Sequence, residues 1–188
     1  INEMAEVYQQ DAGAFRERLK RQYDGYHFGP QLVGVYNPFS LLNALKFQNL
    51  GDYWFQSGTP TYLIRLLNHT REDLDELTGR YYKTSEFVDF KADVEQPLPM
   101  IYQSGYLTIK DYDRDSGRYL LDFPNNEVKE GFVSLVASNY LKTRQSNVNA
   151  WVQDSVDALQ DGDPEKFRRL LTSFLSSIPY TMRRKENE

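Results

Sequence analysis

The spacing of apolar and polar positions divides the chain into helical stretches and one short extended region. Residues 4–22 carry apolar side chains at roughly helical intervals, interrupted near Gly13, and predict one or two amphipathic helices. A polar cap followed by proline occurs at residues 37–38 and again at residues 59–60, and each pair predicts a helix start. Gly51 is the expected stop of the first of these two helices. The first third of the chain should therefore be helical.

The apolar period changes in the middle of the chain. Residues 87–95 look extended, and the prolines within residues 97–99 frame the start of a brief helix. Residues 105–112 and 118–123 then alternate apolar and polar side chains around a turn at residues 113–117. This alternation predicts a β-hairpin.

The last third of the chain returns to helical spacing. Asn125 or Asn126 is expected to cap a long helix, and a polar break at residues 143–149 separates it from two more helices. A Gly-Asp-Pro sequence at residues 162–164 ends one and starts the next, so the two should pair antiparallel. The fold class is therefore expected to be mainly α with a small β-hairpin. The buried stripe of the last helix is expected to consist of Phe167, Leu170, Leu171, Phe174, Leu175 and Ile178.

Composition restricts the class of protein. The 188 residues include 14 Tyr and 11 Phe, so large flat side chains should dominate packing and interfaces. A formal net charge of -5 argues against a general affinity for nucleic acid, which needs clustered Lys and Arg. The absence of cysteine excludes disulfides and thiolate sites and fits a reducing compartment.

The ends of the chain and its hydropathy indicate its setting. No apolar run is long enough to cross a bilayer, and residues 1–10 lack the layout of a secretion signal. We therefore expect a soluble, cytoplasmic protein with no membrane partner. The chain opens on Ile1 and closes on the charged residues 183–188, which predicts that it is a piece of a longer protein.

The sequence lacks the motifs that build familiar catalytic centres. No glycine-rich phosphate loop and no Gly-x-Ser-x-Gly elbow occurs. The acids at residues 73–76 fit a solvated helix face better than a metal site, and His69 fits a helix C-terminus better than a base. Asp89 and Lys91 resemble a nuclease pair but lack the further acids that such a centre needs. We therefore predict no catalytic, cofactor-binding or metal-binding residue in this chain.

The most distinctive element is an aromatic turn. Asp24 and Gly25 should end the preceding helix, because glycine can adopt the positive φ that a tight turn demands. The rings of Tyr23, Tyr26 and Phe28 are expected to fold back onto that helix. We interpret these five residues as a helix-ending aromatic corner, and the alternative is a turn that forms a domain interface or senses a nucleotide.

The order of short helix, hairpin and long helix is that of a winged-helix unit. DNA-binding versions carry a basic helix and wing, whereas Lys110, Arg114 and Arg118 share this hairpin with four acids. A protein-facing role is therefore favoured. The alternative, a nucleic-acid-binding winged-helix module, requires these three cations and Lys129 to converge on one positive face.

Another alternative is a standalone enzyme built on the aromatic turn. It requires Asp24, Tyr26 and His27 to converge in a pocket with shifted titration. The turn itself gives a stability prediction: a valine at Gly25 should cost about 1–3 kcal/mol if that residue has a positive φ.

Five segments, taken jointly and in order, carry a family resemblance. The five segments are residues 23–29 (YDGYHFG), 35–40 (VYNPFS), 53–54 (YW), 103–109 (QSGYLTI) and 121–128 (LDFPNNEV). On these segments the chain resembles, over most of its length, a family of bacterial predicted ATP-binding proteins that is common in Bacteroides-type bacteria. Those proteins have an AAA-ATPase-like domain followed by a PD-(D/E)XK nuclease-like domain.

The resemblance implies that this chain lies between the two catalytic centres. Residues 1–80 would be the helical C-terminal part of the ATPase-like domain, residues 81–143 a winged-helix-like unit, and residues 144–188 a helical connector toward the nuclease-like domain. The chain would act as a non-catalytic lid and connector, whose partner is the rest of its own polypeptide, contacted through aromatic surfaces. ATP and Mg²⁺ are implied for the parent protein, and no cofactor for this segment.

Overall fold

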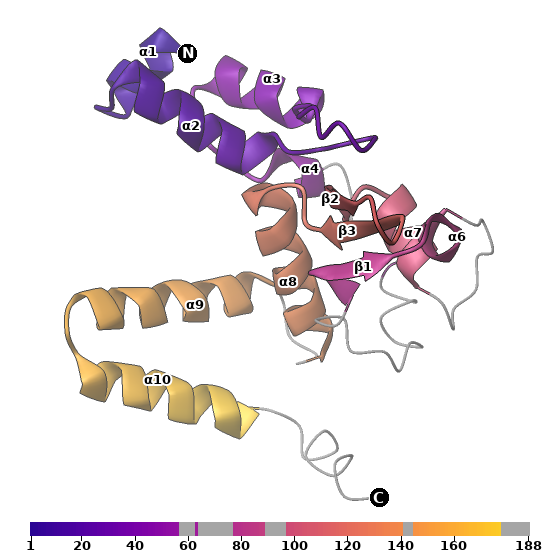
Figure 1. Ribbon diagram of the computed structural model, residues 1–188. Coiled ribbons are helices and arrows are strands. Elements are labelled where there is room, and N and C mark those ends of the chain that lie inside the picture. The colour runs from indigo at the N-terminus through magenta and orange to yellow at the C-terminus, as the bar shows by residue number, and fades with distance from the viewer. Residues whose placement is uncertain (57–62, 64–76, 89–96, 141–144, 178–188) are drawn as a thin grey trace, which may run out of the picture. The chain divides into compact units, whose positions relative to one another are not determined.

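A computed structural model describes residues 1–56, 63, 77–88, 97–140 and 145–177 (Figure 1). The structure is mainly helical with one small antiparallel sheet, which confirms the expected fold class. The chain divides into two compact units, Ile1–Phe132 and Val133–Glu188, which are described separately. Within the described ranges, no helix combines the length and apolar character that crossing a membrane requires.

Two helices open the first unit. α1 (Asn2–Val7) and α2 (Ala12–Tyr23) are separated by a turn in which Gln9 adopts a φ of 51°. The expected interruption near Gly13 is wrong in position, because Gly13 lies in the first turn of α2. Its backbone N–H donates to the carboxylate of Asp11, 2.8 Å away. The acid thus caps α2, and the break falls before it.

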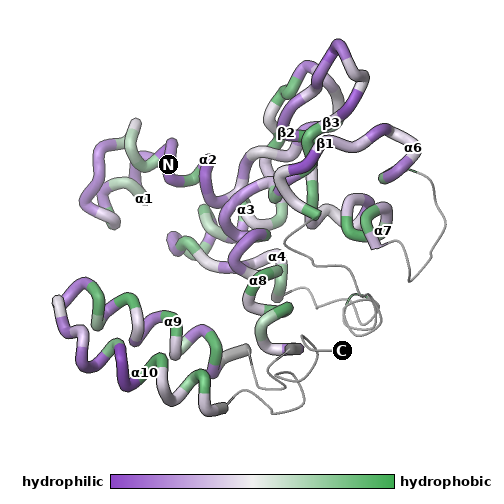
Figure 2. Tube along the Cα trace, turned by 60° about the horizontal axis from the view of Figure 1, so that its bottom comes forward, coloured by the Kyte–Doolittle hydropathy of each residue, from purple (hydrophilic) through white to green (hydrophobic). Residues whose placement is uncertain are grey.

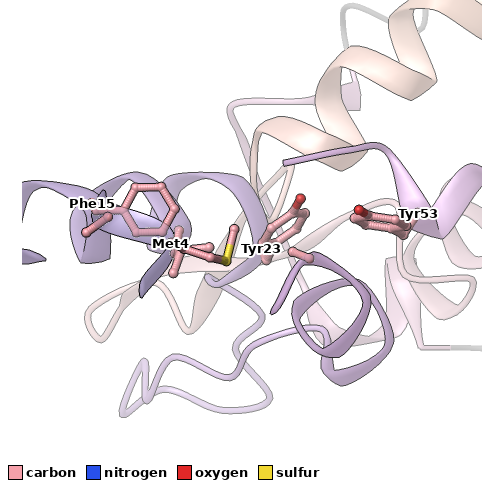
Figure 3. Packing of buried hydrophobic residues seen from close by; sticks show 7 residues of the cluster. Met4, Phe15, Tyr23 and Tyr53 are labelled. Atoms are coloured by element: carbon pink, nitrogen blue, oxygen red, sulfur yellow. The ribbon is translucent and has the colours of Figure 1, made fainter. Parts of the chain in front are cut away.

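Both helices pack on a small aromatic core. Figure 3 shows the ring of Phe15 near Met4, and Tyr23 between Met4 and Tyr53. The Tyr23 hydroxyl donates to the carbonyl oxygen of Gly51 and accepts from its N–H, both at 2.9 Å. These bonds satisfy the phenol group, so the ring is buried without an unpaired polar atom. The buried cluster consists of Met4, Ala5, Phe15, Leu19, Tyr23, Ala44 and Tyr53.

α3 (Pro38–Phe47) begins where the sequence indicates, because the Asn37 side chain accepts from two backbone N–H groups of the first turn. It ends before the expected stop at Gly51. Gln48 adopts the left-handed conformation, with a φ of 51°, and terminates the helix. The short helix α4 (Tyr53–Gln56) follows.

The sheet has three strands, β1 (Arg80–Tyr82), β2 (Thr108–Asp113) and β3 (Arg118–Asp122), in the order β1-β3-β2. Both pairs are antiparallel, and the β2–β3 pair confirms the predicted hairpin. β1 was not expected, since three residues are too few to reveal a period. The register shifts within β2, which makes Lys110 the extra residue of a β-bulge.

Two short helices lie before the hairpin, α6 (Thr84–Phe87) and α7 (Leu98–Gln103). α7 confirms the proline-framed helix. The extended stretch expected from residue 87 is wrong at its start, because Phe87 ends α6. The centroid of its ring lies 4.7 Å from that of Tyr102 in α7 and 5.9 Å from that of Tyr119 in β3, both in edge-on geometry. These aromatic contacts favour the helical turn over an extended stretch. Residues 89–96, the helix start at residues 59–60, the acids at residues 73–76 and His69 lie outside the described residues.

α8 (Asn126–Tyr140) follows the sheet. The Asn125 side-chain oxygen accepts from the N–H of Val128 at 3.1 Å, so the first of the two candidate asparagines is the cap. Val128, Phe132 and Leu135 are buried, as their helical spacing predicts.

The second unit contains an antiparallel helical hairpin of α9 (Gln145–Gln160) and α10 (Pro164–Ser177). Its short connection confirms the prediction (Figure 1), and apolar positions recur along both helices (Figure 2). The Trp151 ring stacks on Phe174 with centroids 4.2 Å apart, and its indole N–H donates to the carbonyl oxygen of Leu170 at 3.0 Å.

Two expectations for this hairpin are wrong in detail. α9 begins at Gln145, inside the expected polar break, because Gln, Ser and Asn are tolerated in a helix when tertiary packing holds it. Leu171 and Leu175 of α10 are exposed, since α10 packs on α9 through the side that carries Leu170 and Phe174. Ile178 lies outside the described residues.

Candidate functional site

The aromatic turn joins the helical part of the first unit to its sheet. Gly25 has a φ of 96°, as expected for the residue that follows the end of α2. A Cβ atom at this position would overlap the backbone oxygen of Pro124, just after β3. Two distant backbone segments therefore approach so closely that only glycine fits at residue 25.

Lys110 joins the same two segments. Its Nζ donates to the carbonyl oxygens of Gly25, at 3.2 Å, and of Pro124, at 2.7 Å. Because bulges re-aim side chains, the irregularity in β2 explains how this residue reaches inward. Burial lowers the pKa of Lys110, while the charges of Asp122 and Asp24 oppose that shift. The ammonium group therefore links the turn to the segment just after β3.

The next residues of the turn are held along the start of β2. The His27 N–H donates to Thr108 Oγ1 at 2.8 Å, and the Thr108 hydroxyl donates back to the carbonyl oxygen of His27 at 3.0 Å. His27 Nδ1 lies 2.7 Å from the carbonyl oxygen of Ile109, so this nitrogen carries the proton. The Tyr26 hydroxyl donates to the carbonyl oxygen of Gly105 at 3.1 Å. The turn is therefore fixed along the start of β2 by hydrogen bonds that involve side chains.

A buried carboxyl group, that of Glu127, joins the helices α3, α4 and α8. Glu127, in the first turn of α8, is fully buried, and its Oε1 accepts from the Ser40 hydroxyl at 3.0 Å and from the Trp54 N–H at 2.9 Å. Its Oε2 has no hydrogen-bond partner among the described residues. Burial raises the pKa of Glu127, and the nearby charge of Asp52 adds to that, against the hydrogen bonds that lower it. α3, α4 and α8 thus meet at one carboxyl group. Because this group is buried, its ionised form is less favourable than it would be in water.

A pocket of about 430 Å³ opens beside the turn. Its wall is made of residues 26–28, 35–38, 54, 102–105 and 107–108, and none of these is Asp, Glu, Lys or Arg. All of them except Tyr102 belong to segments that carry the family resemblance. The pocket and the hydrogen bonds around Gly25, Thr108 and Glu127 form the candidate functional site, which we call the junction.

The structure places the five predicted turn residues in different surroundings. Tyr23 lies in the core and Gly25 at the close approach, while the Asp24 carboxylate accepts from the Gly25 N–H at 2.8 Å. Tyr26 and Phe28 line the pocket instead of folding back onto α2, and Phe28 is 79% exposed. That expectation is wrong because the hydrogen bonds to β2 carry the chain away from α2 toward the sheet.

The groups proposed for an enzyme are occupied in structural roles. The side chains of Asp24, Tyr26 and His27 each bond a backbone group, and Asp24 does not line the pocket. Burial raises the pKa of Tyr26, and the nearby Glu127 adds to that shift. Tyr26 and His27 both line the pocket, and the three side chains hold the turn in place through bonds to backbone groups.

Sequence reasoning missed three residues of the junction. Ser40, Thr108 and Glu127 each join segments far apart in the chain, and local patterns carry no signal for such pairs. Glu127 follows a helix cap, where an acid is ordinarily explained by the helix dipole.

The outer part of the hairpin mixes both signs of charge. The Tyr81 hydroxyl donates to Asp111 at 2.6 Å, and the Ser116 hydroxyl donates to Asp113 at 2.5 Å. These bonds lower the pKa of both carboxyl groups, and Arg118 further lowers that of Asp113.

In the part of the chain that the structure describes, no group of three or more acidic, His or Cys residues could hold a metal ion.

Comparison with known proteins finds a distant similarity. The chain is 31% identical over 170 residues to a protein of Azotobacter chroococcum mcd 1 described as "Uncharacterized protein in vnfD 5'region". The match covers 89% of this chain and 32% of that protein, so the chain spans about a third of the relative's length. No protein-family model and no solved structure matches the chain. A related segment therefore occurs inside a longer protein.

Proposed function

We propose that this chain is a non-catalytic lid and connector module of a longer, cytoplasmic AAA-ATPase-like protein. It couples the nucleotide state of an ATPase core to a nuclease-like effector. In this proposal ATP and Mg²⁺ bind elsewhere in the parent polypeptide, and the partner of this module is the rest of that polypeptide.

The observation that carries the proposal is the convergence of the five resemblance segments on one junction. Residues 23–29 and 103–109 are joined by the His27–Thr108 pair of hydrogen bonds. Residues 35–40, 53–54 and 121–128 meet at the Glu127 carboxyl group. The five segments that carry the family resemblance are therefore also the segments that join the helices to the sheet. This supports a coupling role for the junction.

The junction is suited to pass a movement from one element to another. A displacement of the turn would move β2 through Thr108 and Lys110, because both side chains bond the turn backbone. Packed elements with buried hydrogen bonds shift between discrete arrangements and do not deform smoothly. Such a connection can convert a small change at one end of the module into a rearrangement at the other.

The chemistry of the surfaces supports contact with protein. Among the residues that the structure describes, the pocket wall has no Lys or Arg side chain that would bind a phosphate group. Of the four cations considered for nucleic acid, Lys110 is bonded inside the junction and Arg118 interacts with the carboxyl group of Asp113, which favours contact with protein over contact with nucleic acid. We therefore assign the hairpin to protein contacts.

Calorimetry of this chain with MgATP tests the non-catalytic assignment. We expect no binding up to about 1 mM ligand, a threshold that corresponds to roughly 4 kcal/mol. A micromolar dissociation constant would contradict the proposal.

A second experiment tests coupling in the longer polypeptide. Hydrogen exchange at residues 25–35 and in β2 should change when MgATP is added. Lys110→Met should weaken that change without altering nucleotide affinity, because it removes the bonds to Gly25 and Pro124. Lys129→Met, at an exposed position of α8, is the matched control and should leave the change intact. Exchange at the junction that is indifferent to MgATP would refute the coupling.

A further inference from the structure

The residues that line the pocket beside the turn favour an uncharged ligand. Carboxylates and phosphates need cations or several directed donors in a site. No Lys or Arg is among the described lining residues, and the side chains of Gln103, Ser104 and Thr108 already donate to backbone carbonyl oxygens. The wall is instead dominated by the rings of Tyr26, Phe28, Tyr36, Trp54 and Tyr102. Its volume of about 430 Å³ is that of a site for a small apolar group. The complementary ligand is therefore an uncharged aromatic or branched aliphatic group.

The pocket is formed before anything binds. The Tyr26 hydroxyl is bonded to Gly105, and the backbone of His27 is bonded on both sides to Thr108. These bonds join the two sides of the wall, residues 26–28 and 102–108. A ligand would thus not have to order the wall, which reduces the entropic cost of binding.

Exposed apolar side chains occur in the pocket wall and in the helix that follows it in the chain. Phe28 and Val35 belong to the wall, and they are 79% and 44% exposed. Phe39 and Leu42 of α3, which follow the lining residue Pro38, are also exposed. Exposed apolar side chains at a concave site are typical of protein contacts, in which one anchor side chain is buried and its neighbours cover the rim.

We propose that this pocket is a socket for one bulky apolar side chain, aromatic or branched aliphatic, on a polypeptide segment that lies across Phe28 and Val35. The segment belongs to the same polypeptide outside residues 1–188. This choice of occupant rests on the proposed function and on the length of the Azotobacter relative, of which this chain spans only 32%.

The chemistry of the pocket is tested on this chain by NMR. N-acetyl-phenylalaninamide and N-acetyl-leucinamide are titrated while the Gly105 amide and Trp54 indole signals are followed, with N-acetyl-glutamate amide as the charged control. Saturable shifts with the two apolar probes and none with the charged probe are expected. Equal shifts with all three, or none with any, overturn the inference.

Two valine variants locate the binding. Val35→Trp places a large ring at a lining position and should weaken the apolar probes at least about fivefold, equivalent to ~1 kcal/mol. Val33→Trp adds the same ring at an exposed position outside the wall and should change the affinity less than about twofold. Equal effects of the two variants would place the binding elsewhere.

MgATP added to the same sample separates the two proposals. Binding of MgATP would contradict the lid function and leave the pocket chemistry untouched. Failure of the apolar probes would overturn the socket and leave the lid function standing.

The occupant is tested in the longer polypeptide by photocrosslinking from p-benzoylphenylalanine at Phe28. We expect a crosslink to a bulky apolar residue outside residues 1–188 of the same polypeptide. Crosslinks only within residues 1–188, only to a second copy, or none at all would overturn this choice of occupant.

Discussion

The first unit and the second unit of this chain are each stabilised by a different kind of internal contact. In the first unit, side chains bond backbone groups far away in sequence, as Lys110 does with Gly25 and Thr108 does with His27. In the second unit, two consecutive helices pack through a repeating face, with Trp151 against Phe174 as the main aromatic contact. The first unit therefore depends on a few irreplaceable positions, whereas the second depends on a pattern that many sequences would satisfy.

This difference bears on function. A helical hairpin tolerates change at most positions, while a junction of close approaches transmits any displacement of one segment to the others. Coupling between sites is therefore expected in the first unit, and the following variants test the contrast.

The largest effect is expected at Gly25. Gly25→Val combines a positive φ with an overlap on the Pro124 backbone and should destabilise the first unit by about 3–5 kcal/mol. Gly117→Val, in the hairpin turn, has a positive φ of 65° but no described atom within 4 Å of the added Cβ. It should cost only about 1–2 kcal/mol in urea denaturation. Equal losses would show that the close approach to Pro124 carries no weight.

Trp151→Ala should affect the second unit alone. It removes a half-buried ring and the indole bond to Leu170, and should cost the α9–α10 hairpin about 2–3 kcal/mol. Hydrogen exchange should accelerate in both helices while the sheet is unchanged. Val152→Ala, at an exposed position of α9, serves as the control. Loss of protection throughout β2 and β3 would contradict the separation of the two units.

Glu127 gives a pH dependence with a defined sign. Burial raises its pKa in the folded state above the ordinary value of 4.5, so the folded chain binds this proton more tightly than the unfolded chain. The resulting stability is present below pH 4.5 and is lost as the pH rises through the folded-state pKa. Glu127→Gln keeps an acceptor for Ser40 and Trp54 but cannot ionise. Its melting temperature should therefore fall less than that of the parent chain between pH 4.5 and 7. Parallel pH profiles would refute this assignment.

A smaller effect is expected at Gly131 of α8. An added Cβ would overlap the Phe55 ring, which opposes the gain of about 1 kcal/mol in helix propensity from Gly to Ala. Gly131→Ala should thus be near neutral or destabilising by less than about 1 kcal/mol in the parent chain. In a Phe55→Leu background, which leaves more room, it should become stabilising. A double-mutant cycle with no coupling would contradict the contact.

The contrast also explains what the sequence could predict. Caps and turns are local, so Asn37, Asn125, the hairpin and the α9–α10 pair could be read from short stretches, as could the positive φ of Gly25. β1 could not, because its three residues carry no period. Leu171 and Leu175 of α10 were predicted to be buried, because the spacing of apolar residues does not show how much of the apolar face the neighbouring helix covers.

The candidate site was only partly predictable for the same reason. The aromatic turn was identified from its composition, but the direction of Phe28 was not, since that depends on bonds to β2, some 80 residues away. The inward role of Lys110 was not predicted, and the residue was considered only as one of the hairpin cations, because a β-bulge that re-aims a side chain leaves no trace in the alternation of residues.

The most direct test of the junction is hydrogen exchange on Thr108→Val, which keeps the shape of the side chain and removes the hydroxyl that bonds both backbone groups of His27. If the helices and sheet of the first unit are joined there, exchange should accelerate together in residues 23–36 and in β2 and β3. Acceleration confined to β2, with the turn and the end of α2 unchanged, would contradict the account.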